Sequence, residues 1–203
     1  VVGIQPENFA WRLEPGESFT APEVLLAYSA EGLGCLSRRL HAFIDAHIIH
    51  GAWAGRRRPV LLNSWEAAYF DYDDEKLLQI AQSAAELGVE LFVLDDGWFG
   101  KRNGDTSSLG DWYVNENKIK CGLPELCRKI NALGLDFGIW IEPEMISMDS
   151  ELYRAHPDWM LAAPGRPPIK SRCQYVLDLS RGEIVDDLFE QFSALLSSCN
   201  ISY

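Results

Sequence analysis

The chain has 203 residues, 47% of them hydrophobic and 24% charged, a balance typical of a globular protein with a sizeable core. Thirty acidic side chains against eighteen basic ones give a formal net charge of -12, which disfavours nucleic acid and membrane surfaces as partners. The five cysteines are odd in number and form no C-x-x-C pair, so a reducing, cytoplasmic location is expected rather than a disulfide framework or a zinc ribbon.

The first 58 residues differ in pattern from the rest of the chain. Residues 1–30 resemble the closing strands of a β-domain, with a turn near Pro15-Gly16 and an apolar run that ends at Ser29. Residues 31–58 are predicted to be a linking helix followed by a polar connection, because apolar side chains recur there at helical spacing. His47 and His50 lie on this segment without a third ligand nearby, so they are interpreted as structural.

From Pro59 onward, short apolar runs alternate with amphipathic stretches. Strands are predicted at residues 60–65, 90–94, 137–141 and 175–179, with another beginning at Ile201, and helices at about 73–87, 123–133 and 183–198. Nearly continuous apolar strands that alternate with helices are typical of a parallel sheet covered by helices. The fold class is therefore predicted to be α/β.

Acidic and aromatic side chains gather where the predicted strands end. These residues are Trp65 and Glu66, Asp95, Asp96 and Trp98, Trp140, Glu142 and Glu144, with Arg172 just ahead of the fourth predicted strand. In a (β/α)8 barrel the carboxyl ends of the strands form one mouth, where catalytic and binding groups converge. Indole faces pack on the C–H faces of a sugar, and carboxylates accept hydrogen bonds from its hydroxyls. The pattern indicates a sugar pocket.

Each of these residues alone has an ordinary interpretation. Asp96-Gly97 is a common turn signal, and a lone Trp is more often a core residue than a ligand contact. Arg172 can be a surface ion-pair partner, and Lys101-Arg102 is interpreted as a solvated pair in a loop. Only their recurrence at one face of a sheet favours a binding function.

Several long blocks carry a more specific resemblance. Six blocks resemble, in the same order, the α-galactosidases of glycoside hydrolase family 36, the melibiase and raffinase type. These blocks are Leu62–Asp71, Glu90–Gly100, Ser108–Trp112, Phe137–Met145, His156–Trp159 and Gln174–Ser180. The resemblance implies that residues 1–30 end an N-terminal β-sandwich and that residues 59–203 form the N-terminal part of a (β/α)8 TIM barrel. It implies release of terminal α-galactose from melibiose and raffinose-type sugars by a retaining double displacement. It also implies no cofactor, no metal, and a homo-oligomer for the full-length enzyme.

The resemblance assigns the sugar-binding residues but no catalytic residue. Asp95 and Asp96 are expected to hold galactose hydroxyls, Trp65 and Trp140 to wall the pocket, and Arg172 to donate to the sugar, with Trp98 a weaker candidate beside them. The nucleophile and the acid/base are expected beyond Tyr203, so the isolated chain is expected to be inactive. The family commonly has Gly-Arg-Asn-Gln where this chain has Ser171-Arg-Cys-Gln174, which leaves the loop's hydrogen bonding and the linkage preference open.

Three alternatives remain open at this point. The first is a metal-dependent barrel enzyme, because Asp95, Glu142 and Glu144 are a ligand set that suits Mg²⁺; loss of activity with a chelator would reveal it. A non-catalytic carbohydrate-binding module would bind sugar without hydrolysing it. A family member acting on a related α-linked sugar would share the same pocket.

Overall fold

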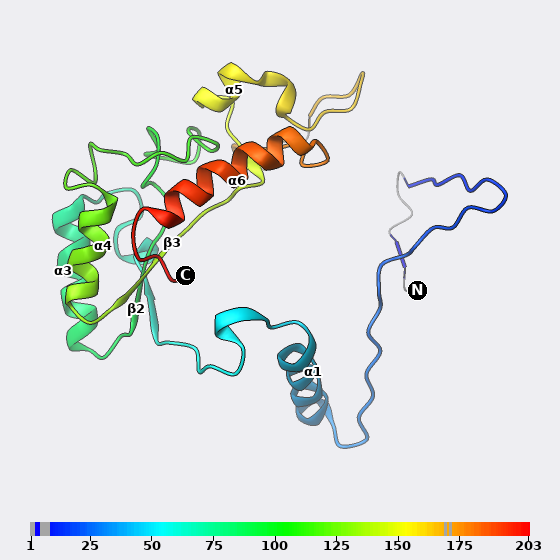
Figure 1. The fold of residues 1–203 in the computed structure, drawn as a ribbon, viewed down its shortest axis with the longest axis horizontal. Coiled ribbons are helices and arrows are strands. Elements are labelled where there is room, and N and C mark those ends of the chain that lie inside the picture. Colours follow the sequence, from blue (N-terminus) through cyan, green and yellow to red (C-terminus); the bar gives the residue numbers. More distant parts are fainter. Residues whose placement is uncertain (1–2, 5–8, 169, 171) are drawn as a thin grey trace. The chain divides into compact units, whose positions relative to one another are not determined.

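The computed structural model describes residues 3–4, 9–168, 170 and 172–203 of the chain. These residues divide into two compact units, Val1–Arg58 and Pro59–Tyr203. The second unit holds the parallel sheet and all of the predicted sugar-binding residues. Figure 1 shows the ribbon coloured along the sequence, from blue at the N-terminus to red at the C-terminus.

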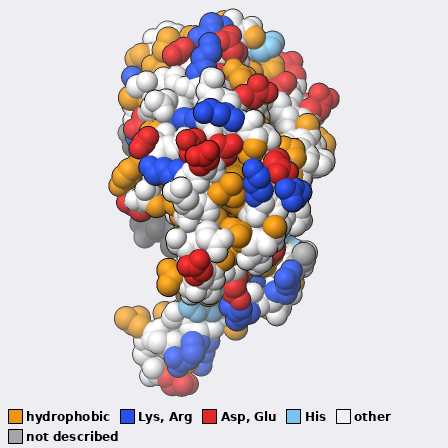
Figure 2. Space-filling model, turned by 90° about the vertical axis from the view of Figure 1, so that its left-hand side faces the viewer, with side chains coloured by type: hydrophobic (Ala, Val, Ile, Leu, Met, Phe, Trp, Pro, Cys, Tyr) orange, Lys and Arg blue, Asp and Glu red, His pale blue; other side chains and the backbone are white. Residues whose placement is uncertain are grey.

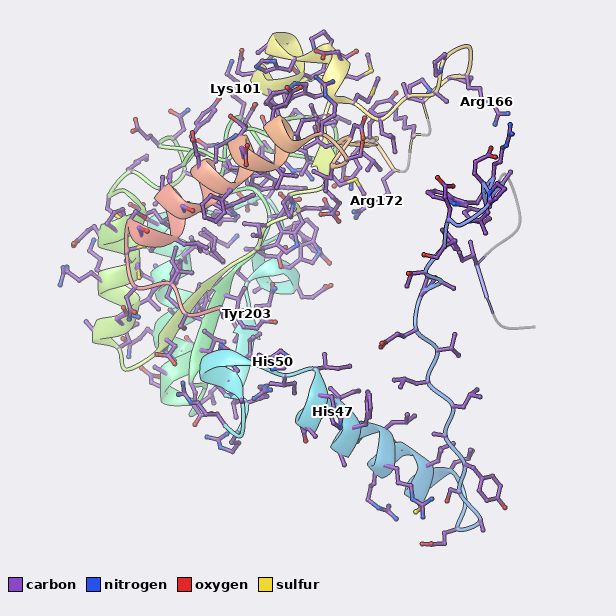
Figure 3. The ribbon with its side chains drawn as sticks, turned by 45° about the vertical axis from the view of Figure 1, so that its right-hand side comes forward. His47, His50, Lys101, Arg166, Arg172 and Tyr203 are labelled. Atoms are coloured by element: carbon purple, nitrogen blue, oxygen red, sulfur yellow. The ribbon has the colours of Figure 1, made fainter. Side chains whose placement is uncertain are left out.

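The described residues of the first unit form one long helix, a short 3-10 turn and segments without regular secondary structure. Helix α1 spans Leu33–His47, within the segment predicted to be helical, and a 3-10 turn, η1, spans Gly51–Trp53. His47 is exposed (Figure 3), and its ring centroid lies 4.7 Å from that of Phe43, one turn earlier in the helix. The predicted β-type segments are not found, because the described residues from 9 to 30 hold no strand.

The second unit is built on a parallel sheet in which neighbours in space are neighbours in sequence. The strands are β1 (Leu61–Asn63), β2 (Leu91–Leu94) and β3 (Asp136–Ile139), in the order β1-β2-β3. Segment 201–203 continues the sheet, because Ile201 pairs in parallel with Phe137 and the Ile139 N–H donates to the Tyr203 carbonyl at 2.9 Å. A parallel α/β sheet is therefore confirmed, while its closure into a barrel stays a prediction.

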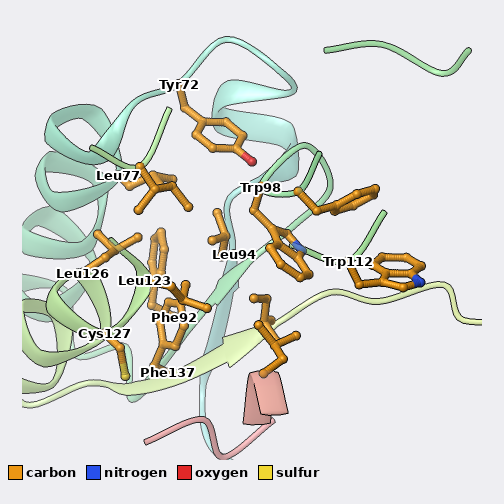
Figure 4. Packing of buried hydrophobic residues seen from close by; sticks show 14 of the residues in the cluster. Tyr72, Leu77, Phe92, Leu94, Trp98, Trp112, Leu123, Leu126, Cys127 and Phe137 are labelled. Carbon is orange, nitrogen blue, oxygen red and sulfur yellow. The ribbon is translucent and has the colours of Figure 1, made fainter. Parts of the chain in front are cut away.

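Helices cover this sheet and bury its core. Helices α3 (Asp74–Glu86) and α4 (Leu123–Ala132) lie side by side, and α6 (Gly182–Ser197) leads into segment 201–203 (Figure 1). Side chains from α3 and α4, including Leu77 and Leu126, pack with Phe92 and Phe137 of the sheet (Figure 4). Burying each such side chain contributes about 1.5–3 kcal/mol, so this core fixes the strands whose ends carry the site.

The outer surface of these helices is mixed in charge. Figure 2 shows basic and acidic side chains interspersed on the face that carries α3 and α4. On α4, Arg128 donates to both carboxylate oxygens of Glu125 at 2.7 Å, an exposed pair on adjacent turns. None of the helices in the described ranges combines the length and the apolar character that a membrane-spanning segment needs.

The fourth predicted strand was wrong as a member of the parallel sheet. Residues Tyr175–Val176 form β5, which pairs antiparallel with β4 (Met145–Ile146) in a separate two-stranded sheet. The position beside β3 is taken by residues 201–203. The physical reason is visible in burial: Val176 and Leu179 are exposed while Leu177 is buried, so this run is not the fully buried strand that its apolar letters suggested.

The long polar segment between β2 and α4 is ordered by side-chain contacts. Both carboxylate oxygens of the buried Asp111 accept backbone hydrogen bonds of 3.1 Å, from Glu151 and Leu152 at the start of α5 (Glu151–Ala155). An isolated bridge joins Phe99 to Val114. Asp111 thus satisfies two N–H groups at the start of α5 and anchors this loop over the sheet.

Candidate functional site

Three neighbouring strands end at the same edge of the sheet and bring the predicted residues together. Asn63 ends β1, Asp95 and Asp96 follow β2, and Trp140 follows β3. The parallel register aligns Asn63 with Val93 and Leu94 with Ile139, so these side chains leave the sheet at the same level. This edge is where sites form in parallel α/β sheets.

Asp95 is held by residues that end β1. The Asn63 side-chain Nδ2 group donates to the Asp95 carboxylate, and the Asn63 side-chain oxygen Oδ1 accepts from the Trp65 backbone N–H at 2.7 Å. The Ser64 hydroxyl accepts from the Asp95 N–H at 3.1 Å. Asn63 therefore links two predicted sugar contacts, Trp65 and Asp95, and both side chains remain half-buried.

Asp96 is paired with a buried arginine that was misinterpreted from sequence. The Nε and Nη2 groups of Arg102 donate to the two Asp96 carboxylate oxygens at 2.8 and 2.7 Å. Arg102 is only 2% exposed, so the prediction of a solvated Lys101-Arg102 pair was wrong for Arg102. It holds for Lys101, whose exposed side chain lies 3.8 Å from Glu151 (Figure 3). A buried charge requires such pairing, because leaving it unpaired is costly.

Gly97 and two polar residues lie beneath the backbone of Asp96. The Tyr72 hydroxyl donates to the Asp96 carbonyl at 3.1 Å, and burial, with Asp96 and Asp95 nearby, raises the pKa of Tyr72. Gly97 has a φ of +100°, and a Cβ there would lie 3.0 Å from the ring of Phe70 and 3.2 Å from Lys118 Nζ. Burial lowers the pKa of Lys118, although Asp96 and Asp71 act in the opposite direction. The Asp-Gly pair is thus part of a tightly packed site floor.

The tryptophans divide into two roles. Trp65 and Trp140 are half-buried, so each residue keeps some solvent-exposed surface. Trp98 is fully buried, and its indole N–H donates to the Trp140 carbonyl at 2.8 Å. The structure therefore does not support the expectation that Trp98 packs beside a sugar. It makes Trp98 a support for Trp140.

An ion pair joins Arg172 to the segment that follows β3. Its Nη2 group is 3.1 Å from Glu142 Oε1, and Glu142 follows Trp140 by two residues. Arg172 is 66% exposed along its side chain and has a φ of +53°, while Ser171 lies outside the described residues (Figure 3). Burial raises the pKa of Glu142, and the neighbouring Gln174 and Arg172 oppose this shift. Arg172 is thus close to the strand ends, free to meet an additional acceptor.

The carboxylates of the site do not gather as metal ligands. Among the residues that the structure describes, no group of three His, Cys, Asp or Glu side chains is placed to hold a metal ion. Asp96 forms an ion pair with Arg102, Glu142 forms one with Arg172, and Glu144 is exposed. The arrangement is suited to accepting and donating hydrogen bonds between aromatic faces.

Sequence reasoning missed Asn63, Tyr72 and Arg102 as members of the site. Asn63 carried a usable signal, because it directly precedes Ser64 and Trp65 at a predicted strand end. Arg102 carried a weaker one, since only its spacing of six residues from Asp96 across Gly97 and Gly100 suggests a loop that folds back.

Known proteins of the same kind share this chain's sequence and structure. Alpha-galactosidase AgaA of Geobacillus stearothermophilus is 52% identical over 202 residues, which cover 100% of this chain and 28% of that protein. Two crystal structures of AgaA variants also match, one in complex with 1-deoxygalactonojirimycin and the other with raffinose. Each match covers 99% of this chain and 28% of the AgaA chain. Both are 51% identical, with TM-scores of 0.93 and 0.92.

These comparisons define both the family and the extent of the match. The chain spans about 28% of the length of the first of these relatives. The Melibiase family profile matches residues 18–203, which include the boundary between the two compact units and every residue of the candidate site. The chain therefore belongs to the Melibiase family, together with the α-galactosidases of glycoside hydrolase family 36.

Proposed function

We propose that this chain supplies the galactose-binding half of an α-galactosidase active site. In this proposal Asp95 and Asp96 accept hydrogen bonds from galactose hydroxyls, Trp65 and Trp140 pack against the ring, and Arg172 donates to the sugar. The substrates are terminal α-galactosides of the raffinose type. The observation that carries the proposal is the meeting of two adjacent carboxylates with two half-buried indoles at the ends of three parallel strands.

Hydrogen bonding at this edge supports a polyhydroxylated neutral ligand. Asp95 is oriented by Asn63 and Asp96 by Arg102, so both carboxylates are fixed before a ligand arrives. Carboxylates fixed in this way accept charge-assisted hydrogen bonds from sugar hydroxyls without a further ordering cost. The complexes of AgaA variants with raffinose and with a galactose-like iminosugar point to the same ligand class.

The reaction we propose is a retaining double displacement by two carboxylates about 5 Å apart. We place the nucleophile directly after segment 201–203. That segment runs parallel to β3, so a residue that follows it arrives at the edge where Asp95 and Trp140 lie. Asp95 and Asp96 hold the sugar while that carboxylate attacks the anomeric carbon. Residues 59–203 are then the first part of a (β/α)8 barrel.

The full-length enzyme tests this proposal directly. It should release galactose from raffinose and nitrophenol from nitrophenyl α-galactoside, and it should not act on the β-linked nitrophenyl galactoside. Release of the α-anomer of galactose, followed by NMR, identifies retention. Binding of raffinose without any turnover would instead support a carbohydrate-binding module, and turnover of only the α-N-acetylgalactosaminide would support the related-sugar alternative.

A chelator separates this proposal from a metal-dependent reaction. The pairing of Asp96 with Arg102 and of Glu142 with Arg172 places cations where a metal ion would need free carboxylates. Activity should therefore survive prolonged dialysis against EDTA. Loss of activity that Mg²⁺ restores would establish the metal-dependent alternative.

We also propose a reducing, cytoplasmic location. All five cysteines are unpaired in the structure, which favours a compartment where thiols stay reduced. Fractionation of the source cells, with galactosidase activity measured in each fraction, tests this location.

A further inference from the structure

Among the described residues, Arg102 is the most buried charged residue. Its side chain is 2% exposed, and that of its partner Asp96 is 8% exposed. The guanidinium donates to both Asp96 oxygens, and its Nη1 donates to the Ser107 carbonyl at 2.9 Å. An ion pair buried to this extent contributes little net stability to the fold, so stability alone does not explain why Arg102 and Asp96 are paired here.

The surroundings of Arg102 fix it in one orientation. The guanidinium carbon lies 5.7 Å from the ring centre of Phe70 and 5.9 Å from that of Phe99. The loop that carries Arg102 is closed by a 2.9 Å hydrogen bond from the Lys101 N–H to the Ser108 hydroxyl. A Cβ at Gly100 would lie 2.9 Å from Ser108, which requires glycine at this turn. The arginine is therefore pre-positioned by the fold.

This geometry leaves part of the Asp96 carboxylate available to a ligand. Each carboxylate oxygen has two lone-pair directions, and the side-on guanidinium occupies one on each oxygen. The remaining directions, on the face of Asp96 that keeps its 8% exposure, can accept sugar hydroxyls. A fixed fork also prevents the carboxylate from rotating, which a single point charge such as Lys would allow.

We propose that Arg102 is a positioning residue that orients Asp96 for galactose. The proposal rests on the proposed function, because it assumes that Asp96 is a sugar ligand. Arg102 itself does not contact the sugar. It acts through Asp96, so its removal should matter only while Asp96 is present as a carboxylate.

A double-mutant cycle in the full-length enzyme tests this dependence. Arg102→Met, Asp96→Asn and the double variant are compared for binding of 1-deoxygalactonojirimycin by calorimetry and for kcat and KM on nitrophenyl α-galactoside. Loss of a charged hydrogen bond predicts that each single variant binds the iminosugar about 10- to 100-fold more weakly. The double variant should bind no more weakly than the weaker single variant.

Two further variants sharpen the result. Arg102→Lys keeps the charge but loses the fork, so its binding should fall between those of the wild type and Arg102→Met. Lys101→Met changes the adjacent, exposed residue and should bind as the wild type does. Should Arg102→Met fail to fold, as judged by its thermal transition, the cycle is run with Arg102→Lys instead.

The outcomes separate the two proposals. Wild-type binding by a folded Arg102→Met variant, or losses in the two single variants that multiply in the double variant, would overturn the role of Arg102. Absence of iminosugar binding by the wild-type enzyme would overturn the proposed function itself.

Discussion

The indole N–H of Trp98 donates a 2.8 Å hydrogen bond to the backbone carbonyl of Trp140 and so joins the segments that follow β2 and β3. Trp98 is fully buried, and Trp140 is half-buried, stacked 6.2 Å from Phe99. A core residue thus sets the backbone position of an aromatic residue that we assign to the sugar pocket.

Replacing Trp98 with Phe should destabilise the full-length enzyme and weaken its iminosugar binding. The change leaves the Trp140 carbonyl without this donor, and the smaller Phe ring leaves a cavity in the core. Each effect lowers the free energy of unfolding by about 1 kcal/mol or more. Trp112→Phe is the matched control, because the Trp112 indole N–H is buried without a hydrogen-bond partner among the described residues. Unfolding in urea and calorimetric titration measure the two effects. Equal losses in the two variants would contradict a specific role for the Trp98 hydrogen bond.

Asp96→Asn should cut kcat/KM of the full-length enzyme about 10- to 100-fold, because a charged acceptor of sugar hydroxyls becomes a neutral amide. Asp96→Ala should also lower stability, by about 3–5 kcal/mol, since it leaves the buried Arg102 without its partner. Asp105→Asn, at an exposed loop position, serves as the control. Steady-state kinetics and thermal unfolding of all three variants check this, and near-normal kinetics in Asp96→Asn would remove Asp96 from the site.

Strand β2 was predictable because a fully buried parallel strand is a continuous apolar run. Leu91–Leu94 is buried along its whole length, and its amphipathic neighbour, α3, lies within the helix predicted at about 73–87. The run at 175–179 has similar letters but is only half-buried. Apolar composition does not distinguish a central strand from one side of a small antiparallel pair.

The residues that we propose face the ligand were easier to pick out from the sequence than the residues that support them. Asp95, Asp96 and Trp140 directly follow strands, and a strand end is visible in sequence. Arg102 lies in a polar loop, and its burial comes from Phe70 and Phe99 packing around it. Such tertiary burial has no local signature, so a buried charge and a solvated one share the same sequence pattern.

Glu142→Gln should change how the stability of the full-length enzyme depends on pH. Burial raises the pKa of Glu142 above its ordinary value of 4.5, so the native state holds this proton to higher pH than the unfolded state does. The contribution of Glu142 to stability therefore falls as pH rises through its native pKa, and Gln lacks this loss. The stability of Glu142→Gln relative to wild type should thus be greater at pH 7 than at pH 4.5.

Urea unfolding of both proteins at these two pH values measures the difference. Glu116→Gln, which replaces an exposed carboxylate, is the control and should show no such trend. If the stability of Glu142→Gln relative to wild type instead decreases as the pH rises from 4.5 to 7, pairing with Arg172 outweighs the burial of Glu142.

Cys127 should be the slowest cysteine to react with iodoacetamide. Burial, and to a smaller extent the neighbouring Cys199 thiol, raises the pKa of Cys127 to about 12, so very little thiolate is present at pH 8. Cys173, half-buried beside Arg172, should be labelled first. Mass spectrometry of peptides from the native protein follows the labelling, and the urea-unfolded protein, in which all five thiols should react, is the control. Rapid native labelling of Cys127 would show that α4 opens readily.

The chain of residues 1–203, expressed alone, should not hydrolyse an α-galactoside. The reaction needs two carboxylates that flank the glycosidic bond, whereas Asp95 and Asp96 are adjacent at one strand end and are placed to meet a sugar from one side only. Asp96 is also held by Arg102, which opposes its use as a nucleophile. Glu142, whose raised pKa would suit a general acid, is paired with Arg172 instead.

The fold gives a second, independent reason to expect an inactive chain. Helix α6 exposes apolar side chains, with Phe189 71% exposed, and the sheet edge formed by segment 201–203 has no described neighbour beyond it. Such a face and edge favour aggregation. The test is to purify residues 1–203, confirm packed aromatic side chains by near-ultraviolet circular dichroism, and assay nitrophenyl α-galactoside. Turnover above the uncatalysed rate by the folded chain would place a catalytic pair within these residues, and Glu142 and Asp95 would then be the first carboxylates to replace.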